Sequence, residues 1–249
     1  MTAATRASVN TTARLAGALY LATVPFAVFG LKYVSTVPLV GAGAGRSLES
    51  AARLLRLGVV SNVIGLLLFT LAVVALYEIL RPVSARYAAL MAVLGLMSVP
   101  MMLLTEVGRL AAVRLVTGGD LGAFTSAQLQ AQAGFFLDLY QDGLLVSQVF
   151  WGLWLLPLAL LVYRSGFLPR LVGVAVAIAG VAWLIDWGMQ LLVPGRSLPI
   201  GFLSVGELAL PLWLLIRGVN GGKWQALAAG RSIGSPPEAP GTPSAVLKG

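Results

Sequence analysis

Six long apolar runs, separated by short polar or glycine-rich segments, organise this sequence. A helix that crosses a bilayer needs about 20 predominantly apolar residues, and most of the runs reach that length. In chain order they cover residues 13–31, 54–80, 88–116, 134–162, 171–193 and 200–216. The pattern predicts an all-α fold, a polytopic membrane helix bundle with six transmembrane helices.

Local signals mark where several of these helices begin, end and pack. Arg81-Pro82 closes the second run, because proline cannot continue a helix and disfavours helical geometry in the residue before it. Thr125, with Gln128 three residues later, predicts a capping box at the start of the fourth helix. Gly173 and Gly180 predict close helix packing along the fifth run.

The segments outside the runs divide the chain into three parts. Residues 1–12 are a polar N-terminal segment, 13–220 the six-span membrane domain, and 221–249 a Gly-, Pro-, Ser- and Ala-rich stretch expected to be a disordered cytoplasmic tail. The first run could instead be the apolar part of a secretory signal. Its length and the lack of a small-residue cleavage site after it favour a retained span.

The fourth run carries the most unusual pattern, a polar stripe on an apolar helix. Asp138, Gln141, Asp142 and Gln148 are spaced by three, four and seven residues, or by multiples of a turn, so they share one helix face. Acidic residues in a membrane span are costly and usually face protein or water. We therefore expect other helices to place polar groups opposite this stripe.

Other polar residues fall at a similar predicted depth, in the outer half of the bundle. The candidate ligand-binding residues are Glu207, Asp186, Asp138, Asp142, Asn62, Glu106, Arg109 and Arg56. They predict one cavity that opens outward. Acids outnumber nearby arginines, so an unpaired carboxyl, with Glu207 the first candidate, is expected to take up a proton or bind a cation.

Each candidate also has a purely structural interpretation. Glu106 and Arg109 are three residues apart and could form a simple ion pair. Asp138 and Asp142 could be wetted by headgroup water, and Asp186 could anchor a helix at the interface. A bond from Glu207 to Asn62 or an arginine could only lock helices together. The tryptophans are expected to serve packing and the interface rather than a cofactor.

Composition narrows the chemistry further. The chain is 58% hydrophobic and 10% charged, whereas soluble domains carry about 25% charged residues. It has no cysteine and no histidine, which excludes thiolate chemistry, histidine-ligated haem and the usual zinc sites; no metal and no cofactor are expected. The net charge of +8 is explained by basic residues at span ends facing anionic lipid, so no nucleic-acid partner is expected.

Several segments resemble a bacterial multi-pass membrane family catalogued as domain of unknown function 4386. The resemblance spans residues 10–220 and is carried by the motifs at 12–20, 76–83, 163–173, 206–208 and 213–220. Its most specific element is the turn RSGFLPR at 164–170. It implies an integral protein of the bacterial cytoplasmic membrane without an established activity. It also implies acids at Asp186 and Glu207. Family members often carry a histidine near the position of Tyr140, which this chain lacks.

Three functions are compatible with these patterns. The first is binding or transport of a cation, a proton or a small polar solute in the outward-opening cavity. The second is a non-catalytic structural or accessory membrane subunit. The third is an intramembrane acid–base enzyme that uses paired carboxyls. The lipid bilayer is the expected environment, and a homodimer could compensate for the small size of a six-span transporter.

The distribution of basic residues gives a testable topology. One side, made of residues 1–14, the 81–86 and 164–170 loops and residues 217–249, carries ten Lys and Arg, against seven on the opposite side. We therefore expect both termini in the cytoplasm. A reporter that is active only in the cytoplasm should be active when fused after Gly249. Activity restricted to a reporter that works outside the cytoplasm would reverse the topology.

Overall fold

The structure is a bundle of helices, and no strand occurs in the residues that it describes. This computed structural model describes residues 3–33, 48–118, 124–193, 203 and 205–230. The elements are α1 (Ala3–Ala27), the π-helix η1 (Val28–Tyr33), α2 (Leu48–Leu80), α3 (Ala85–Thr117), α4 (Ser126–Leu153), α5 (Leu155–Arg164), α6 (Arg170–Leu192), the 3₁₀ turn η3 (Val205–Leu208), α8 (Ala209–Ile216) and α9 (Gly221–Ala228).

Five of these stretches are long and apolar enough to cross a membrane. They are Ser8–Leu31, Glu49–Leu80, Ala85–Thr117, Ser126–Arg164 and Arg170–Leu192, and a shorter apolar helix covers Val205–Ile216. The predicted all-α membrane bundle is confirmed. The sixth span stays a prediction, because residues 200–202 and 204 lie outside the described part of the chain.

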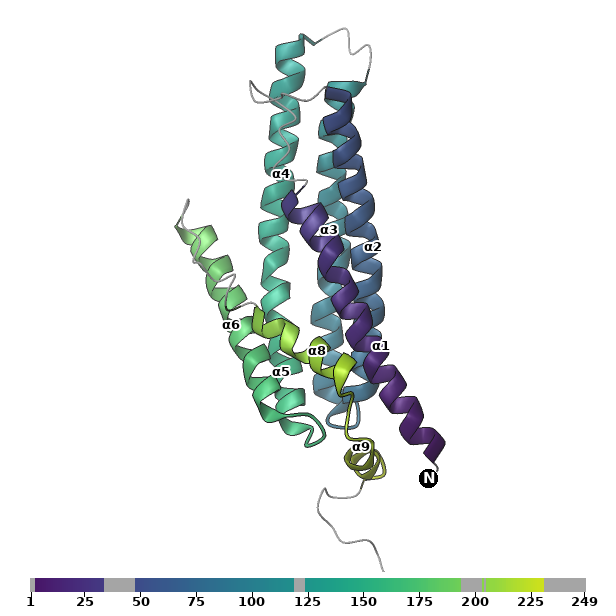
Figure 1. The fold of residues 1–249 in the computed structure, drawn as a ribbon. Helices are drawn as coiled ribbons and strands as arrows, with labels where there is room; N and C mark the ends of the chain where they lie inside the picture. The colour runs from purple at the N-terminus through teal and green to yellow at the C-terminus, as the bar shows by residue number, and fades with distance from the viewer. Residues whose placement is uncertain (1–2, 34–47, 119–123, 194–202, 204, 231–249) are drawn as a thin grey trace, which may run out of the picture.

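The helices form two groups that contact each other directly, with α4 packed against α6, and that α1 and α8 also bridge (Figure 1). The long helices α2, α3 and α4 stand beside one another, α5 and α6 form a hairpin, and α8 packs on both α1 and α6. The N-terminal end of α1, the turns at 81–84 and 165–169, and α9 all lie at the lower end in Figure 1. The described ends of the chain are therefore on the same side of the bundle.

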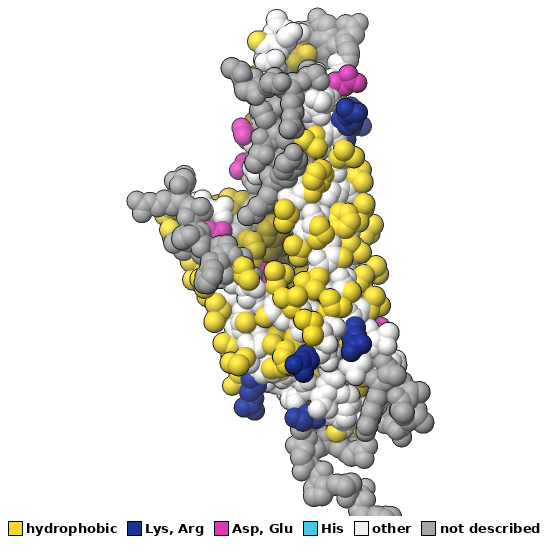
Figure 2. All heavy atoms as spheres, in the orientation of Figure 1, with side chains coloured by type: hydrophobic (Ala, Val, Ile, Leu, Met, Phe, Trp, Pro, Cys, Tyr) yellow, Lys and Arg dark blue, Asp and Glu magenta, His cyan; other side chains and the backbone are white. Residues whose placement is uncertain are grey.

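The surface has the character of a membrane-embedded protein. Large apolar side chains such as Leu104 and Leu171 are 72% and 81% exposed. Figure 2 shows hydrophobic side chains over most of the visible face, with Lys and Arg side chains gathered mainly near its lower end. Lipid would cover these apolar side chains, as it covers the outer face of other helix bundles.

The buried core is concentrated in the lower part of the bundle. Leu76 of α2, Leu158 of α5, Val176 of α6 and Leu210 of α8 belong to one cluster of buried apolar residues. A smaller cluster around Leu55 and Val113 joins α2, α3 and α4 farther up. Between the two clusters the interior is more polar, because Asn62, Glu106, Arg109 and Gln148 are buried there.

The fourth apolar run, predicted as one helix over 134–162, lies within the single candidate span Ser126–Arg164. The helix is interrupted at Trp154, which separates α4 from α5. Pro157 lies three residues after this break and has no N–H to donate to the carbonyl of Leu153. Its ring also crowds that carbonyl, so the break one turn before the proline has a direct steric cause.

The other local predictions concern the ends of the helices. The Thr125–Gln128 capping box is confirmed, and α2 ends at Leu80 immediately before Arg81-Pro82. The helical structure extends beyond the expected membrane domain at both ends. The helix α1 begins at Ala3 within the polar N-terminal segment, and Gly221–Ala228 form α9 at the start of the expected tail. Residues 231–249 lie outside the described part.

Close helix packing generates a stability prediction. A Cβ added to Gly17 of α1 would lie 2.6 Å from the carbonyl oxygen of Pro211 and 2.8 Å from the backbone nitrogen of Leu215. The substitution Gly17→Ala should push α8 away from α1 and destabilise the protein by about 1–3 kcal/mol. Thermal unfolding in detergent would measure the loss.

The chain supplies a matched control for this substitution. A Cβ at Gly188 of α6 meets no described atom within 4 Å. Gly188→Ala should leave the melting temperature unchanged or raise it slightly, because alanine favours the helix. Equal effects of the two substitutions would show that α1 and α8 do not pack as closely as described.

Candidate functional site

A cavity of about 650 Å³ lies between the two helix groups. Residues from α1, η1, α2, α3, α4, α6 and η3 line it. Its polar lining side chains are Tyr20, Thr23, Asn62, Ser98, Gln148, Asp186, Gln190 and Glu207. Figure 2 shows a recess bordered by hydrophobic side chains on this face of the molecule. Its volume falls within the range of small-molecule sites in proteins.

The first carboxyl in the cavity is that of Glu207, on the 3₁₀ turn that precedes α8. Tyr20 of α1 donates its hydroxyl hydrogen to Oε1, and the indole Nε1 of Trp183 on α6 donates to Oε2 at 3.0 Å. Each oxygen therefore has one donor from a different helix. The position of Glu207 on a tight turn at a helix start directs its side chain toward both donors.

The second carboxyl is that of Asp186, one turn of α6 beyond Trp183. The side-chain amides of Gln148 and Gln190 both donate to its Oδ2, at 3.0 Å and 2.7 Å. Gln190 also donates to Oε1 of Gln148 at 3.4 Å, which ties the two amides together. The other oxygen, Oδ1, is buried and has no hydrogen-bond partner among the described residues.

The donors around both carboxyls are electrically neutral. Phenol, indole and amide groups hold Glu207 and Asp186, and no Lys or Arg is among the described residues that line the cavity. No group of three or more acidic side chains suited to a metal ion occurs in the described part of the chain. Among the described residues, the cavity therefore has two acids without a basic partner.

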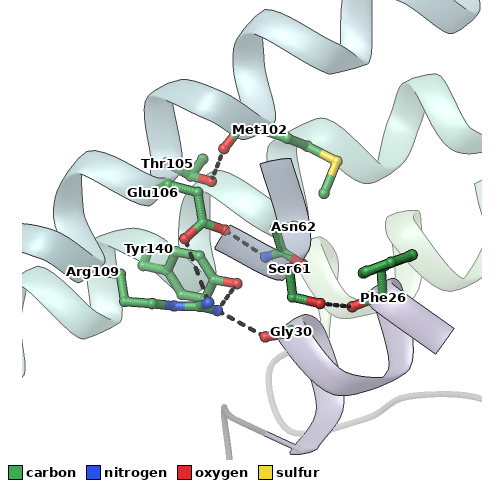
Figure 3. Close-up of polar contacts among 9 residues, drawn as sticks. All are labelled: Phe26, Gly30, Ser61, Asn62, Met102, Thr105, Glu106, Arg109 and Tyr140. Carbon is green, nitrogen blue, oxygen red and sulfur yellow. Dashed lines mark hydrogen bonds and ion pairs between the residues drawn. The ribbon is translucent and has the colours of Figure 1, made fainter. Parts of the chain in front are cut away.

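A separate buried network, drawn in Figure 3, adjoins the cavity through Asn62. Asn62 of α2 donates from Nδ2 to Oε1 of Glu106 on α3 at 2.5 Å, and Glu106 Oε2 lies 3.4 Å from Nη1 of Arg109. Arg109 donates from Nη2 to the carbonyl oxygen of Gly30, at 3.1 Å, and to the hydroxyl of Tyr140. The predicted Glu106–Arg109 pair is confirmed.

This network holds four elements together. Arg109 is 1% exposed and Glu106 is 4% exposed, so the ion pair is withdrawn from solvent. Through Gly30 the guanidinium fixes η1, while Asn62 and Tyr140 bring in α2 and α4. The guanidinium carbon of Arg109 also lies 4.1 Å from the centre of the Tyr140 ring. Asn62 lines the cavity as well, so the network supports its wall.

The remaining predicted residues lie elsewhere. Asp138 and Asp142 are exposed on α4 and do not line the cavity. Arg56 is exposed on α2, where its Nη2 lies 3.4 Å from Oγ1 of Thr117. Of the polar stripe on the fourth run, Gln148 is the member that lines the cavity.

Several residues of both clusters were not singled out from the sequence. Tyr20 and Gln190 hold the cavity carboxyls, and Tyr140 completes the arginine network. A tyrosine hydroxyl in the middle of an apolar helix needs a partner, and this requirement could have marked Tyr20 and Tyr140. Gln190 lies four residues after Asp186, a spacing that places both on one helix face.

The buried ion pair generates a prediction for stability. Arg109→Gln leaves the Glu106 carboxyl buried without its cation, which should destabilise the protein by roughly 3–5 kcal/mol. The double substitution Glu106→Gln/Arg109→Gln removes both charges and should recover a large part of that loss. Unfolding by a denaturing detergent, followed by circular dichroism, would measure both.

A double-mutant cycle measures the interaction energy between Glu106 and Arg109. Additive effects of Glu106→Gln and Arg109→Gln would mean that the two side chains do not interact in the folded protein. Glu78→Gln serves as the control, because Glu78 is exposed on α2 and its loss should have little effect.

Comparison with known proteins finds a family and a relative whose function is not established. Residues 15–218 match a family described as "Domain of unknown function (DUF4386)". An uncharacterised protein of Archaeoglobus fulgidus is 31% identical over 146 residues, which cover 58% of this chain and 74% of the relative. No solved structure matches. The family match covers most of the chain and includes both polar clusters, and the protein therefore belongs to the DUF4386 family.

Proposed function

We propose that this protein binds a small cationic solute in the cavity between its helix groups, as an integral protein of the cytoplasmic membrane. The observation that carries the proposal is the pair of carboxyls, Glu207 and Asp186, held in one cavity by neutral donors alone. Glu207 and Asp186 are the residues expected to face the cation.

Electrostatics supports a cationic ligand. A carboxylate removed from water is costly unless a cation or strong donors compensate for the lost hydration. Arg109 compensates Glu106 in the neighbouring network, whereas no described basic side chain lines the cavity. A bound cation would provide the missing charge, and the low dielectric of the bundle would strengthen the attraction.

The structural-subunit interpretation is the second candidate, and the buried Arg109 network favours it. That network joins η1, α2, α3 and α4 and needs no ligand. It explains why Glu106, Arg109 and Asn62 are buried. It gives no role to the cavity or to the buried Oδ1 of Asp186, so ligand binding accounts for more of the observations.

A thermal-shift experiment tests the proposal. Purified protein in a neutral detergent is titrated with sodium, potassium, ammonium, methylammonium and tetramethylammonium chlorides and with phenethylamine hydrochloride at constant ionic strength. A cation that binds the folded state should raise the melting temperature in a saturable manner. Glu207→Gln and Asp186→Asn should reduce that rise.

Glu78→Gln is the matched control, because it removes an exposed carboxyl near the C-terminal end of α2 that does not line the cavity. It should retain the full ligand-dependent rise. If no cation in the panel raises the melting temperature, or if Glu78→Gln loses the rise as well, the cavity is not a cation site.

A further inference from the structure

The aromatic lining of the cavity indicates that the uncharged part of the ligand, its body, is apolar. Tyr20, Phe69, Trp151, Trp154 and Trp183 line it, and they come from α1, α2, α4, the α4–α5 break and α6. Such rings provide apolar contact area and faces that attract a cation. A site for a bare inorganic ion needs oxygen ligands at close range rather than five aromatic side chains.

The rings are held in defined orientations by contacts with one another. Trp154 makes edge contacts with Tyr20 and Phe69, with ring centres 5.8 Å and 5.2 Å apart. Trp151 and Trp183 form a perpendicular pair at 5.4 Å. Because Tyr20 and Trp183 also donate to Glu207, the aromatic wall and that carboxyl are one connected structure.

The environment of Asp186 indicates that the charged group of the ligand carries a hydrogen-bond donor. Two amides occupy Oδ2, while Oδ1 is buried without a partner in the described part of the chain. A buried carboxylate oxygen in that state lacks a hydrogen-bond donor. An ammonium N–H supplies both the donor and the positive charge, whereas a quaternary ammonium supplies the charge alone.

The capacity of the cavity agrees with an organic ligand. About 650 Å³ exceeds what a single dehydrated ion or methylammonium would fill. An amine that carries one ring or a short alkyl body can place its nitrogen at Asp186 and its apolar part against the tryptophans.

We propose that the ligand is a protonated amine with an apolar body, whose N–H donates to Oδ1 of Asp186 and whose body packs against Trp151 and Trp183. This inference rests on the proposed function and narrows it to one ligand class. Glu207 supplies the second negative group, already oriented by Tyr20 and Trp183.

Three probes of similar shape separate the contributions. Phenethylamine carries the charge and the N–H, trimethyl(2-phenylethyl)ammonium carries the charge without an N–H, and 2-phenylethanol carries neither charge nor ammonium. Binding is followed by tryptophan fluorescence and by calorimetry in detergent at pH 7. We expect phenethylamine to bind about tenfold or more tightly than either analogue.

Substitutions in the cavity test whether the probes bind there. Asp186→Asn should weaken phenethylamine binding about tenfold or more and bring it close to that of 2-phenylethanol. Trp151→Leu should weaken all three probes, because it removes part of the wall. Glu78→Gln should leave all three affinities unchanged, and this control also corrects for partitioning of the probes into micelles.

The outcomes separate this inference from the proposed function. If inorganic or small cations bind in a manner that depends on Glu207 and Asp186 while phenethylamine does not, the amine assignment fails and cation binding stands. If the quaternary or neutral analogue binds as tightly as phenethylamine, the contact with Oδ1 is wrong. If no cation of either kind binds, both fail. The comparison of the three probes on unaltered protein decides even if Asp186→Asn does not fold.

Discussion

A charged side chain inside this bundle needs polar partners from other helices, because the hydrocarbon core of the membrane has no groups that hydrogen-bond to it as water does. The Glu106–Arg109 pair shows how the protein meets that requirement: Asn62 compensates the acid, and Gly30 and Tyr140 compensate the base. Partners from η1, α2 and α4 are needed at once, so the charges determine how these elements are arranged. The position of η1 and one wall of the cavity depend on this arrangement.

Apolar packing governs the other end of the molecule. Gly173 and Gly180 let α6 approach α5 so closely that an added Cβ would lie 2.9 Å from the nearest atom at either position. The hairpin and the short helix α8 form a close-packed base together with α1 and α2. Above this base the interruption at Trp154 separates α4 from α5 and places that ring in the cavity wall. A tight base and a polar upper part therefore leave room for a cavity at their junction.

The fold class could be predicted because long apolar runs constrain it strongly. The end of α2 at Leu80 and the Thr125 capping box followed from short-range chemistry. The break at Trp154 was missed although Pro157 was visible, because proline in a membrane helix is often tolerated and its effect depends on neighbouring helices. Residues 221–228 form a helix although composition favoured a disordered tail, since Asn220 caps it and Trp224 donates to the carbonyl of Ile79.

The polar residues were less predictable than the helices. The membrane depths predicted from the sequence suggested that Asp138 and Asp142 share one cavity with Asp186 and Glu207. In the structure Asp138 and Asp142 are exposed, and Glu106 belongs to a separate network. Depth follows from counting residues along a span, but the direction of a side chain follows from the rotation and pairing of helices. Tyr20 lies 187 residues from Glu207 in the sequence, and no local pattern links them.

The central claim is that Glu207 and Asp186 give one cavity a negative potential. Because the chain has no cysteine, a single Leu144→Cys substitution in the cavity wall can report that potential directly. Reaction rates with cationic and anionic methanethiosulfonate reagents are each divided by the rate with free cysteine. A clear preference for the cationic reagent, reduced by Glu207→Gln or Asp186→Asn, is the expected result. Equal normalised rates, or a preference for the anionic reagent, would contradict the account.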